Sequence, residues 1–379
     1  MILDYVTLKF LWWFFISILF IVFFILGGRD FGVCMLLPFI GKTDEQRRLL
    51  INSIGPTWDG NQVWFITAGG ATFAAWPIVY ACAFSGLYIA LFIVLLSLIL
   101  RPPSFEFRSK LPSVKWRSIW DHGLFLSGFI PALIFGVGLG NLLLGLPFHF
   151  DDNLQSHYTG SFFQLLNPFA ILFGLSSVAI IALHGGTYLQ KKLPDIFHQR
   201  VMKLNFILGL FFIISFILAG LWVKFGINGF KIKTINDINS SLIPISKEVI
   251  RLPNGWFHNY ERYSYLWVLP AISILSTLGA ITASKANINK TAIIMSTLAI
   301  CFSLLTINVA LFPFILPSST HPNHSLTLWD ATSSHRTLHY MFWVTIVFLP
   351  IVLSYTYWAF SVFAGKVEQK DILTQPESY

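Results

Sequence analysis

The sequence predicts an all-α integral membrane protein with about nine spanning helices. First, its 379 residues are 55% hydrophobic and only 11% charged, against about 25% charged residues in ordinary soluble domains. Second, the apolar residues form long continuous runs, without the alternation of period two that is typical of membrane strands. Uncharged runs of about 18 residues or more indicate spanning helices, because lipid offers no hydrogen-bond partner to an open backbone.

The first apolar run has no charged residue from Phe10 to Leu26. It is longer than the apolar region of a signal peptide, and it lacks a basic segment before it and a small-residue cleavage site after it. We therefore expect it to remain as helix 1. The nine spans are predicted near residues 10–40, 59–77, 79–100, 119–145, 162–189, 204–224, 264–284, 291–316 and 337–363.

The connections between these spans alternate in charge. One set holds sixteen basic residues: Lys42, Arg47, Arg48, Arg101, Arg108, Lys110, Lys115, Arg117, Lys191, Lys192, Arg200, Lys203, Lys285, Lys290, Lys366 and Lys370. The other set holds Lys9 and Arg336 in short segments and six basic residues in the long connection 224–263. Because basic residues of short connections stay in the cytoplasm, we expect an external N-terminus and a cytoplasmic C-terminus. Residues 1–379 then form one polytopic transmembrane domain with an external loop at about 225–263.

The net charge of +8 follows the connections and forms no binding stripe, so we expect no nucleic-acid partner. Cys34, Cys82 and Cys301 lie in apolar stretches without metal-ligand spacing, so we expect buried thiols and no metal site. Two small-residue patterns, at 136–140 and 68–71, favour close helix packing in lipid.

Two adjacent charges, Arg29 and Asp30, follow the uncharged part of helix 1. If that helix runs to Gly41, Asp30 lies about 16 Å from its cytoplasmic end. Each charge costs about 2.5–3.5 kcal/mol on insertion scales, so a partner should offset it. Because adjacent helical residues point about 100° apart, the two need not pair with each other. Bonding to neighbouring helices and a role in a proton or ion path both stay open.

A second polar group opens the second span, at the cytoplasmic boundary. Asp59 lies there at a helix N-terminus, where a carboxylate caps free N–H groups and meets the positive end of the helix dipole. Capping does not require the polar and aromatic residues around it, however. Capping and function both stay open for this supporting patch of Trp58, Asn61, Gln62 and Trp64.

The histidines His122 and His184 fall at similar depth on the cytoplasmic side. Two facing imidazoles can ligate a b-type haem. Intramembrane histidines are more often hydrogen-bonded contacts between helices, and no second signature supports a haem. We therefore expect that this chain binds no haem and contains no catalytic residue of its own.

Several strings resemble subunit II of cytochrome bd-type ubiquinol oxidases, and the resemblance is collinear over nearly the whole chain. They lie at 28–33, 47–54, 58–64, 73–77 with 80–81, 162–169 and 311–319, and the string Trp-Asp-Gly-Asn-Gln-Val-Trp at 58–64 is the most specific. One departure concerns helix 1, where the family often shows Asp-Gly-Phe-Asp. Here Gly27 takes the place of the first acid and Arg29 that of the Phe, while Asp30 keeps its position.

The resemblance implies two four-helix bundles and a peripheral helix, packed against a subunit I in the inner (plasma) membrane of a bacterium. It implies that subunit I holds two b-type haems, a d-type haem and the quinol-oxidation loop, with quinol and oxygen as substrates in the respiratory chain. Subunit II would supply an interface and part of a cytoplasmic proton pathway, and a structural quinone and a small single-helix accessory subunit are further implications.

Within that pathway the resemblance assigns Asp59, with Asp30 as the second acid. Two alternatives stay open. A secondary transporter would have a broken helix at Gly27–Asp30, and a purely scaffolding subunit would need no buried acids.

Overall fold

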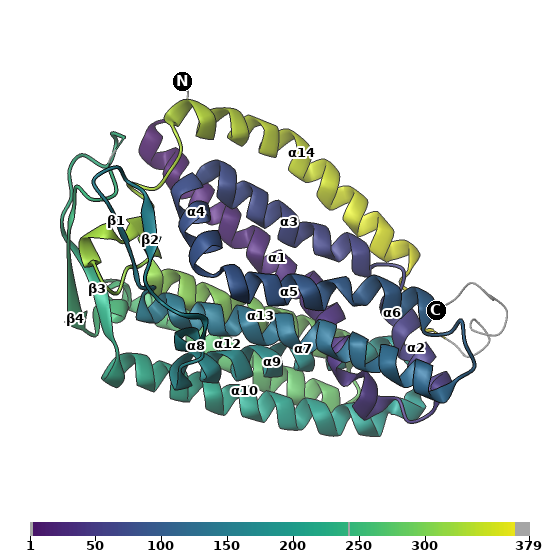
Figure 1. The fold of residues 1–379 in the computed structure, drawn as a ribbon. Coiled ribbons are helices and arrows are strands. Elements are labelled where there is room, and N and C mark those ends of the chain that lie inside the picture. The colour runs from purple at the N-terminus through teal and green to yellow at the C-terminus, as the bar shows by residue number, and fades with distance from the viewer. Residues whose placement is uncertain (1–2, 242, 368–379) are drawn as a thin grey trace.

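The computed structural model describes residues 3–241 and 243–367. Two bundles of four helices lie side by side (Figure 1). The first contains α1 (Tyr5–Ile40), α3 (Trp58–Ala75), α5 (Tyr88–Ile99) and α7 (Val114–Leu144). The second contains α9 (Pro168–Lys192), α10 (His198–Gly226), α12 (Val268–Lys285) and α13 (Asn289–Leu311). Helix α9 joins the bundles, because both α1 and α7 pack against it.

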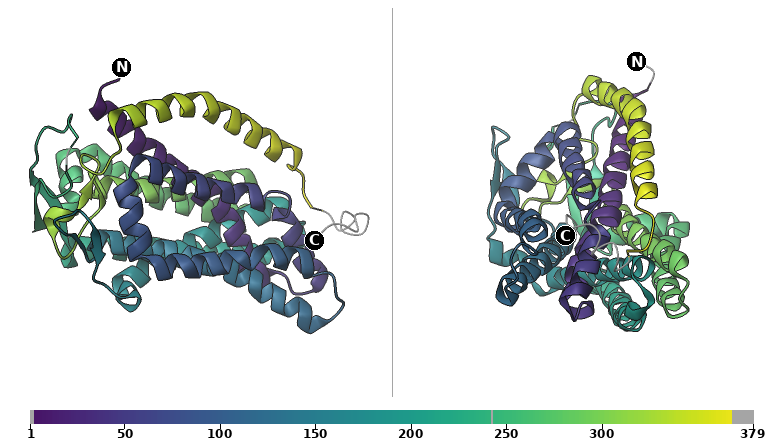
Figure 2. Two further views of the ribbon diagram at one scale, coloured as in Figure 1. Left: turned by 45° about the horizontal axis from the view of Figure 1, so that its top comes forward. Right: turned by 90° about the vertical axis from the view of Figure 1, so that its right-hand side faces the viewer.

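The ninth long helix, α14 (His335–Val362), runs along the outside of the bundles beside α1, as the two views of Figure 2 show. Within the described residues, eight helical segments are long and apolar enough to cross a membrane. Helix α3, the ninth predicted span, is not among these eight segments. Its first turns are polar, because they contain Asp59, Asn61 and Gln62. The predicted all-α architecture of two bundles and a peripheral helix is confirmed.

The predicted third span, 79–100, is wrong at both ends. Its residues belong to α4 (Pro77–Gly86), which turns away from α3, and to α5, which continues through α6 (Arg101–Phe107). The spanning segment is therefore Tyr88–Phe107. Arg101, which we assigned to a cytoplasmic connection, is fully buried in α6. Pro102 and Pro103 resemble a loop in the sequence, but the first turn of a helix tolerates proline because its N–H groups have no helical partner.

Two other predicted ends shift for similar local reasons. The predicted span 162–189 begins as the short α8 (Phe162–Leu165), and α9 then starts at Pro168 with Asn167 as its N-cap. The predicted span 291–316 ends early, because α13 stops at Leu311 before Pro313 and the chain continues as a strand. Helix α2 (Asp44–Ile54) connects α1 to α3.

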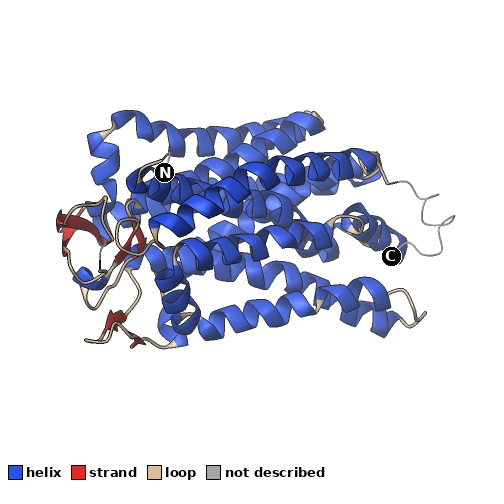
Figure 3. Cartoon of the chain, turned by 90° about the horizontal axis from the view of Figure 1, so that it is seen from above, coloured by secondary structure: helices blue, strands red, loops and turns tan. Residues whose placement is uncertain are grey.

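Three small antiparallel sheets gather at one end of the molecule (Figure 3). Their strands are β1 (Phe148–Phe150) with β2 (Ser156–Tyr158), β3 (Asn228–Thr234) with β4 (Glu248–Pro253), and β5 (Phe314–Leu316) with β6 (Leu326–Thr327). We call this end the strand cap. The connection 225–263, expected as a loop, is folded: β3, β4 and α11 (His258–Arg262) lie in it, and Phe230 and Trp256 pack on Phe314 in a buried cluster.

Buried charges hold the strand cap in place. Lys247 and Asp330 form an ion pair of 2.6 Å whose side chains are 1% exposed. Lys9, expected in a short external segment, is fully buried in α1, where its ammonium donates to backbone carbonyls, among them those of Ile238 and Trp329. The cap is thus tied to the start of α1.

Close helix contacts follow one of the two small-residue patterns. Gly136 and Gly140 of α7 lie so near α9 that a Cβ on either would come within 2.8 Å of its backbone. In the other pattern Ala68 is fully buried, but a Cβ on Gly69 or Gly70 would meet nothing within 4 Å in the described part of the chain. Both of those glycines line a cavity instead.

Candidate functional site

The charged pair of α1 lies deep in the molecule, where α1 crosses α9 in backbone contact. At the crossing, a Cβ on Gly32 would come within 2.3 Å of the Ile181 carbonyl oxygen. Asp30 is fully buried, and α1 continues ten residues beyond it to Ile40, which is about 15 Å of helix. Asp30 therefore lies about as far from this end of α1 as the sequence predicts.

Asp30 has two partners that stabilise a carboxylate. Its Oδ2 accepts a hydrogen bond of 2.7 Å from the Asn61 amide of α3, and its Oδ1 lies 3.5 Å from Arg29 Nε. The neighbouring residues therefore do pair, although their positions on the helix did not require it. The pair and the amide together offset much of the cost of a buried charge.

Arg29 is held on its other sides as well. Its Nη2 lies 3.3 Å from Thr57 Oγ1, just before α3. Its guanidinium stacks 4.6 Å from the ring centre of Tyr188 and 4.7 Å from that of Phe360. Arg29 thus connects α1, α3, α9 and the peripheral helix α14.

Arg101 is a member of this region that our sequence reasoning missed. Its Nη2 donates a hydrogen bond of 2.7 Å to the Ser127 carbonyl, and its guanidinium lies 4.7 Å from the Phe31 ring centre. It is close enough to Asp30 for an electrostatic interaction, while its buried Nη1 has no hydrogen-bond partner in the described part of the chain. The one sequence feature that could have indicated its burial is its position directly after an uncharged run.

The patch at the start of α3 divides between two faces of that helix. Asn61 and Trp64 are buried inside, and Trp58 stacks on Phe105 with ring centres 5.0 Å apart. Gln62 is partly buried, and its Nε2 has no hydrogen-bond partner within residues 3–241 and 243–367. Asn61 is therefore the member of the patch that joins the buried Arg29 and Asp30. The other members of the patch do not contact Asp30 through a hydrogen bond among the described residues.

Asp59 lies on the opposite face of α3 and is exposed. It belongs to the first turn, but it makes no hydrogen bond or ion pair with any described residue, and the Thr57 N-cap makes no side-chain capping bond. Because Asp59 and Asn61 are two residues apart, they point about 200° apart around the helix. The structure therefore does not bring Asp59 and Asp30 together.

The two histidines do not face each other. His184 is buried, with Nδ1 at 2.8 Å from Ser296 Oγ and Nε2 at 3.0 Å from the Ile25 carbonyl. Both of its nitrogens thus have partners within this chain. His122 is exposed on α7, where Nδ1 bonds to the Ser118 carbonyl.

A large apolar cavity of about 680 Å³ lies near the strand cap, between the first bundle, α4, α8 and α13. Trp13, Phe20 and Phe135 are among the aromatic residues that line it. Trp76 also lines it, and no described residue forms a hydrogen bond with its buried indole Nε1. The cavity thus offers a mainly apolar volume with the free indole N–H of Trp76 in its wall.

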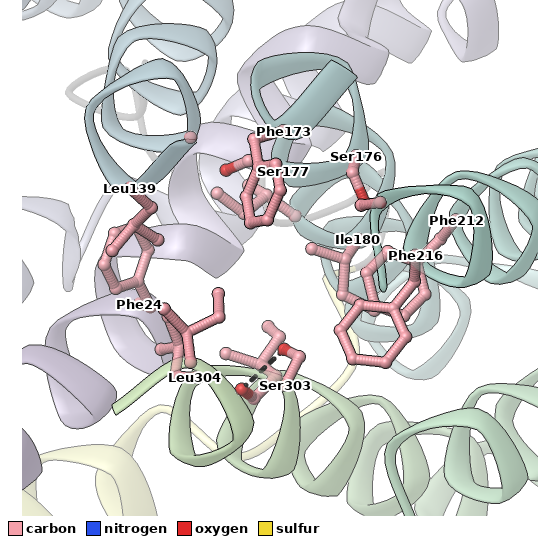
Figure 4. Close-up of a pocket in the computed structure, with 15 residues that line it drawn as sticks. Phe24, Leu139, Phe173, Ser176, Ser177, Ile180, Phe212, Phe216, Ser303 and Leu304 are labelled. Carbon is pink, nitrogen blue, oxygen red and sulfur yellow. Dashed lines mark hydrogen bonds between the residues drawn. The ribbon is translucent and has the colours of Figure 1, made fainter. Parts of the chain in front are cut away.

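A smaller cavity of about 60 Å³ lies between α1, α7, α9, α10 and α13 (Figure 4). Its lining includes Phe24, Phe216 and three serines, of which Ser303 donates to the Ile300 carbonyl of its own helix. Because no charged residue lines it, this cavity supplies packing space and no acid–base chemistry.

Comparison with known proteins gives a consistent result. Residues 8–363 match the family described as cytochrome bd terminal oxidase subunit II. Cytochrome bd-I ubiquinol oxidase subunit 2 of Escherichia coli (strain K12) is 45% identical over 370 residues, which are 98% of each chain. Cytochrome bd ubiquinol oxidase subunit 2 of Bacillus subtilis (strain 168) is 30% identical over 96% of this chain and 98% of the relative. Among solved structures, a chain of the bd oxidase from Geobacillus thermodenitrificans shares the fold, with a TM-score of 0.68 at 14% identity over 94% of this chain and 98% of that one.

Proposed function

Because the chain belongs to the family of cytochrome bd terminal oxidase subunit II, we propose that it carries protons from the cytoplasmic side toward the oxygen-reducing site of subunit I. The chain is a multi-pass membrane subunit of a bacterial ubiquinol oxidase complex, and subunit I is its partner. Family membership sets the secondary-transporter alternative aside. The proton role is what separates our proposal from a purely scaffolding subunit.

The observation that carries the proposal is the position of Asp59. It is an exposed carboxylate without a partner among the described residues, at the end of a helix whose outer face includes the exposed Val63 and Ile66. That face is open to a second subunit. A carboxylate at the membrane boundary exchanges protons with water and can pass them along such an interface. The helix N-terminus favours its charged form, which suits a hydrated entry point better than a buried relay.

Asp30 is the second acid of the proposed pathway. It lies deeper, on the other side of α3, and Asn61 and Arg29 orient its two oxygens. Among the described residues no hydrogen bond links Asp30 to Asp59. The two acids would therefore serve separate parts of the proton pathway. Asp59 would act at the open face of α3, and Asp30 within the bundle beside Arg101.

The test is Asp59→Asn in the complete oxidase complex. Asp59 makes no hydrogen bond with any described residue, and Asn matches it closely in shape, so the change removes the ionisable group and leaves the fold. We expect normal assembly and haem content, with quinol:oxygen turnover slowed on the order of 100-fold, the low end of what a proton-transfer group contributes. Asp59→Glu should retain more activity than Asp59→Asn.

Asp152→Asn is the matched control, since Asp152 is an exposed aspartate in the strand cap. It should turn over at the parent rate. If fully assembled Asp59→Asn also did so, Asp59 would be only a helix-terminal charge, and Asp30→Asn would be the next variant to measure.

We further propose that the large cavity holds a structural quinone, as the family resemblance implies. The fit rests on two observations: a volume of about 680 Å³ lined mainly by apolar side chains, and the unpaired Nε1 of Trp76. An isoprenoid tail would fill the apolar volume, and the indole N–H would donate to a ring carbonyl oxygen. In this position the quinone would fill space and stabilise the fold, and no step of turnover passes through it.

The corresponding variant is Trp76→Phe, which keeps the ring volume and removes the donor. Quinone extracted from the purified complex should fall by about one molecule per complex. Trp358→Phe on the exposed face of α14 should leave the quinone content unchanged. Equal quinone content in parent and Trp76→Phe would mean that this donor holds no quinone.

For the membrane orientation, we propose that the strand cap is external and the opposite end cytoplasmic. Removing the buried Arg101 and the buried Lys9 from the two sets leaves fifteen basic residues against seven, which retains the same bias. We also propose that the haems of the complex lie in subunit I, since His184 uses both nitrogens in hydrogen bonds.

A further inference from the structure

Side chains of the segment that follows β5 bind the outer edge of β1. The carbonyl oxygen of Phe148 accepts hydrogen bonds from the hydroxyl groups of Ser318 and Thr320. The backbone N–H of Phe150 donates a hydrogen bond of 2.9 Å to Nδ1 of His324. Of these three side chains, only the imidazole titrates near neutral pH. The contact between His324 and Phe150 is therefore the one in this set that a change of pH can break.

We propose that His324 is a pH-sensitive switch in the strand cap, which binds β1 while its imidazole is neutral and releases β1 when the imidazole is protonated. Because Nδ1 accepts the hydrogen bond from Phe150, the neutral ring must carry its own proton on Nε2. An imidazolium carries a proton on both nitrogens and has no free lone pair. Protonation therefore turns the acceptor into a second donor, which cannot bond to the N–H of Phe150.

The groups around His324 oppose a positive charge on its ring. The ring centre of His321, in the same turn, lies 5.1 Å from that of His324. The ring of His149 on β1 lies 5.0 Å from that of His321. Lys247 is buried just before β4 and carries the cation of the ion pair with Asp330. Each of these three groups repels a proton on His324.

The carboxylates on the neighbouring elements do not cancel this repulsion. Three of them have a basic partner of their own: Asp330 pairs with Lys247, Asp151 with His157, and Glu248 with Lys233. His324 makes no ion pair with a carboxylate in the described part of the chain. The neutral form of the ring is therefore the one that this environment favours.

Burial, ahead of repulsion by His321, His149 and Lys247, holds the pKa of His324 below its ordinary value. That ordinary value is about 6.5, and an open, hydrated His324 regains it. Below about pH 6.5 the open state therefore binds more protons than the closed state. The contact contributes its full stability above this pH and loses it as the pH falls toward the lower pKa of the closed state.

The switch acts locally on β1. The same turn is bound to β4 through Asn323, whose Oδ1 accepts a hydrogen bond of 2.8 Å from the backbone N–H of Val249. An amide side chain does not titrate in this pH range, and neither do the hydroxyl groups of Ser318 and Thr320. Protonation of His324 should therefore free the N–H of Phe150 while the turn stays in place.

The compartment that His324 senses depends on the membrane orientation. In the orientation proposed above, the strand cap faces the external side, so the external pH would set the state of the switch. The contact itself depends neither on that orientation nor on the proton pathway, because all of its groups lie within the cap of this chain.

The experiment is hydrogen–deuterium exchange of the purified, complete oxidase complex, measured by mass spectrometry at pH 7.5 and pH 5.5. Protection factors, corrected for the intrinsic effect of pH on exchange, are compared for the peptides that contain Phe150 and Val249. In the parent, the protection of Phe150 should fall about tenfold between the two pH values, because an open state with a pKa of about 6.5 takes up a proton that the closed state excludes. The protection of Val249 should not change.

Two variants separate the titration from the hydrogen bond itself. His324→Asn offers an amide oxygen in place of Nδ1 and cannot be protonated, so Phe150 should be equally protected at both pH values. His324→Ala removes the acceptor, so the protection of Phe150 should be low at both. His122→Asn, which changes an exposed histidine on α7, should match the parent.

Equal protection of Phe150 at the two pH values in the parent would overturn the proposal. A fall that persists in His324→Asn would overturn it too, because another group would then be responsible. So would an equal loss of protection at Val249, since the cap would then open as a whole. These readouts involve neither turnover nor quinone content, so failure of the proton pathway or of the quinone site would leave the result intact.

Discussion

At the scale of single residues, the protein keeps charges inside an apolar bundle by giving each a different set of partners. Asp30 uses an amide and a guanidinium, Arg29 uses two aromatic rings, and Arg101 uses a backbone carbonyl and the ring of Phe31. Aromatic faces and carbonyls suit cations in lipid, because they offset lost hydration without adding a second charge.

The Arg29–Asp30 pair leads to a prediction about stability. Arg29→Gln leaves a fully buried carboxylate without its ion pair, which costs about 3–5 kcal/mol when a buried pair is broken. We expect a lower unfolding temperature and a lower yield of assembled complex. The double variant Arg29→Gln/Asp30→Asn should recover much of the loss, because it removes both charges. Arg336→Gln, at an exposed position, is the control. A double variant no more stable than Arg29→Gln would show that the pair is not what holds Arg29.

The histidines lead to a second residue-scale prediction. His184→Ala removes the partner of Ser296 and of the Ile25 carbonyl, at a cost of about 1–3 kcal/mol for buried groups left unpaired. The assembled complex should nevertheless show every haem band in the parent ratio, and so should His122→Ala. Selective loss of one haem band in either variant would identify that histidine as a ligand.

At the scale of elements, α3 and the crossing of α1 with α9 position the candidate site. Helix α3 presents Asn61 inward and Asp59 outward, so one short helix serves both the buried cluster and the open face. The crossing depends on glycines, because any side chain at Gly32 or Gly185 would separate the two helices.

We therefore predict that Gly185→Ala destabilises the protein. Its Cβ would lie 2.5 Å from the Gly32 carbonyl carbon, and such overpacking typically costs about 1–3 kcal/mol. The matched control is Gly138→Ala, since nothing lies within 4 Å of a Cβ there. That change should be neutral or stabilising, given the higher helix propensity of Ala. Equal unfolding temperatures for the two variants would contradict a tight α1–α9 contact.

At the scale of the whole molecule, the two ends differ in kind. One end is the folded strand cap, which is held by the buried Lys247–Asp330 ion pair and by strand pairing. The other end holds the C-terminal part of α1, α2 and the last described residues (Figure 1). The peripheral α14 spans the distance between these ends while it packs mainly on α1.

The orientation of these ends can be measured by cysteine labelling. Ser240→Cys in the cap and Ser378→Cys in the tail, which lies outside the described residues, should react with an impermeant reagent from opposite sides of the membrane. The native Cys34 and Cys82 are buried, and Cys301 is partly buried, so Cys301→Ser is the suitable background. Labelling of both new cysteines from the same side would contradict the nine-span topology.

Much of the fold could be predicted from the sequence, because its causes are local. An uncharged run of helical length must span the bilayer as a helix whatever surrounds it. The charge of each connection likewise acts through nearby residues. These two effects predict the helix order, the helical class and the depth of Asp30 without knowledge of packing. The sequence strings at 28–33 and 58–64 also predict the family, which the comparisons confirm.

The remaining features depend on contacts between segments that are far apart in the sequence, and only the tertiary structure decided them. Arg101 is stable in the interior because Ser127 and Phe31 lie next to it, and no pattern around position 101 reveals that. Asn61 faces Asp30 of α1, so Asp59 lies on the opposite face of α3, away from Asp30. His324 meets the backbone of Phe150 because the segment after β5 lies along β1, and no local pattern predicts that contact. Local hydrophobicity determines which segments cross the membrane, whereas side-chain packing between helices determines which of their polar groups meet.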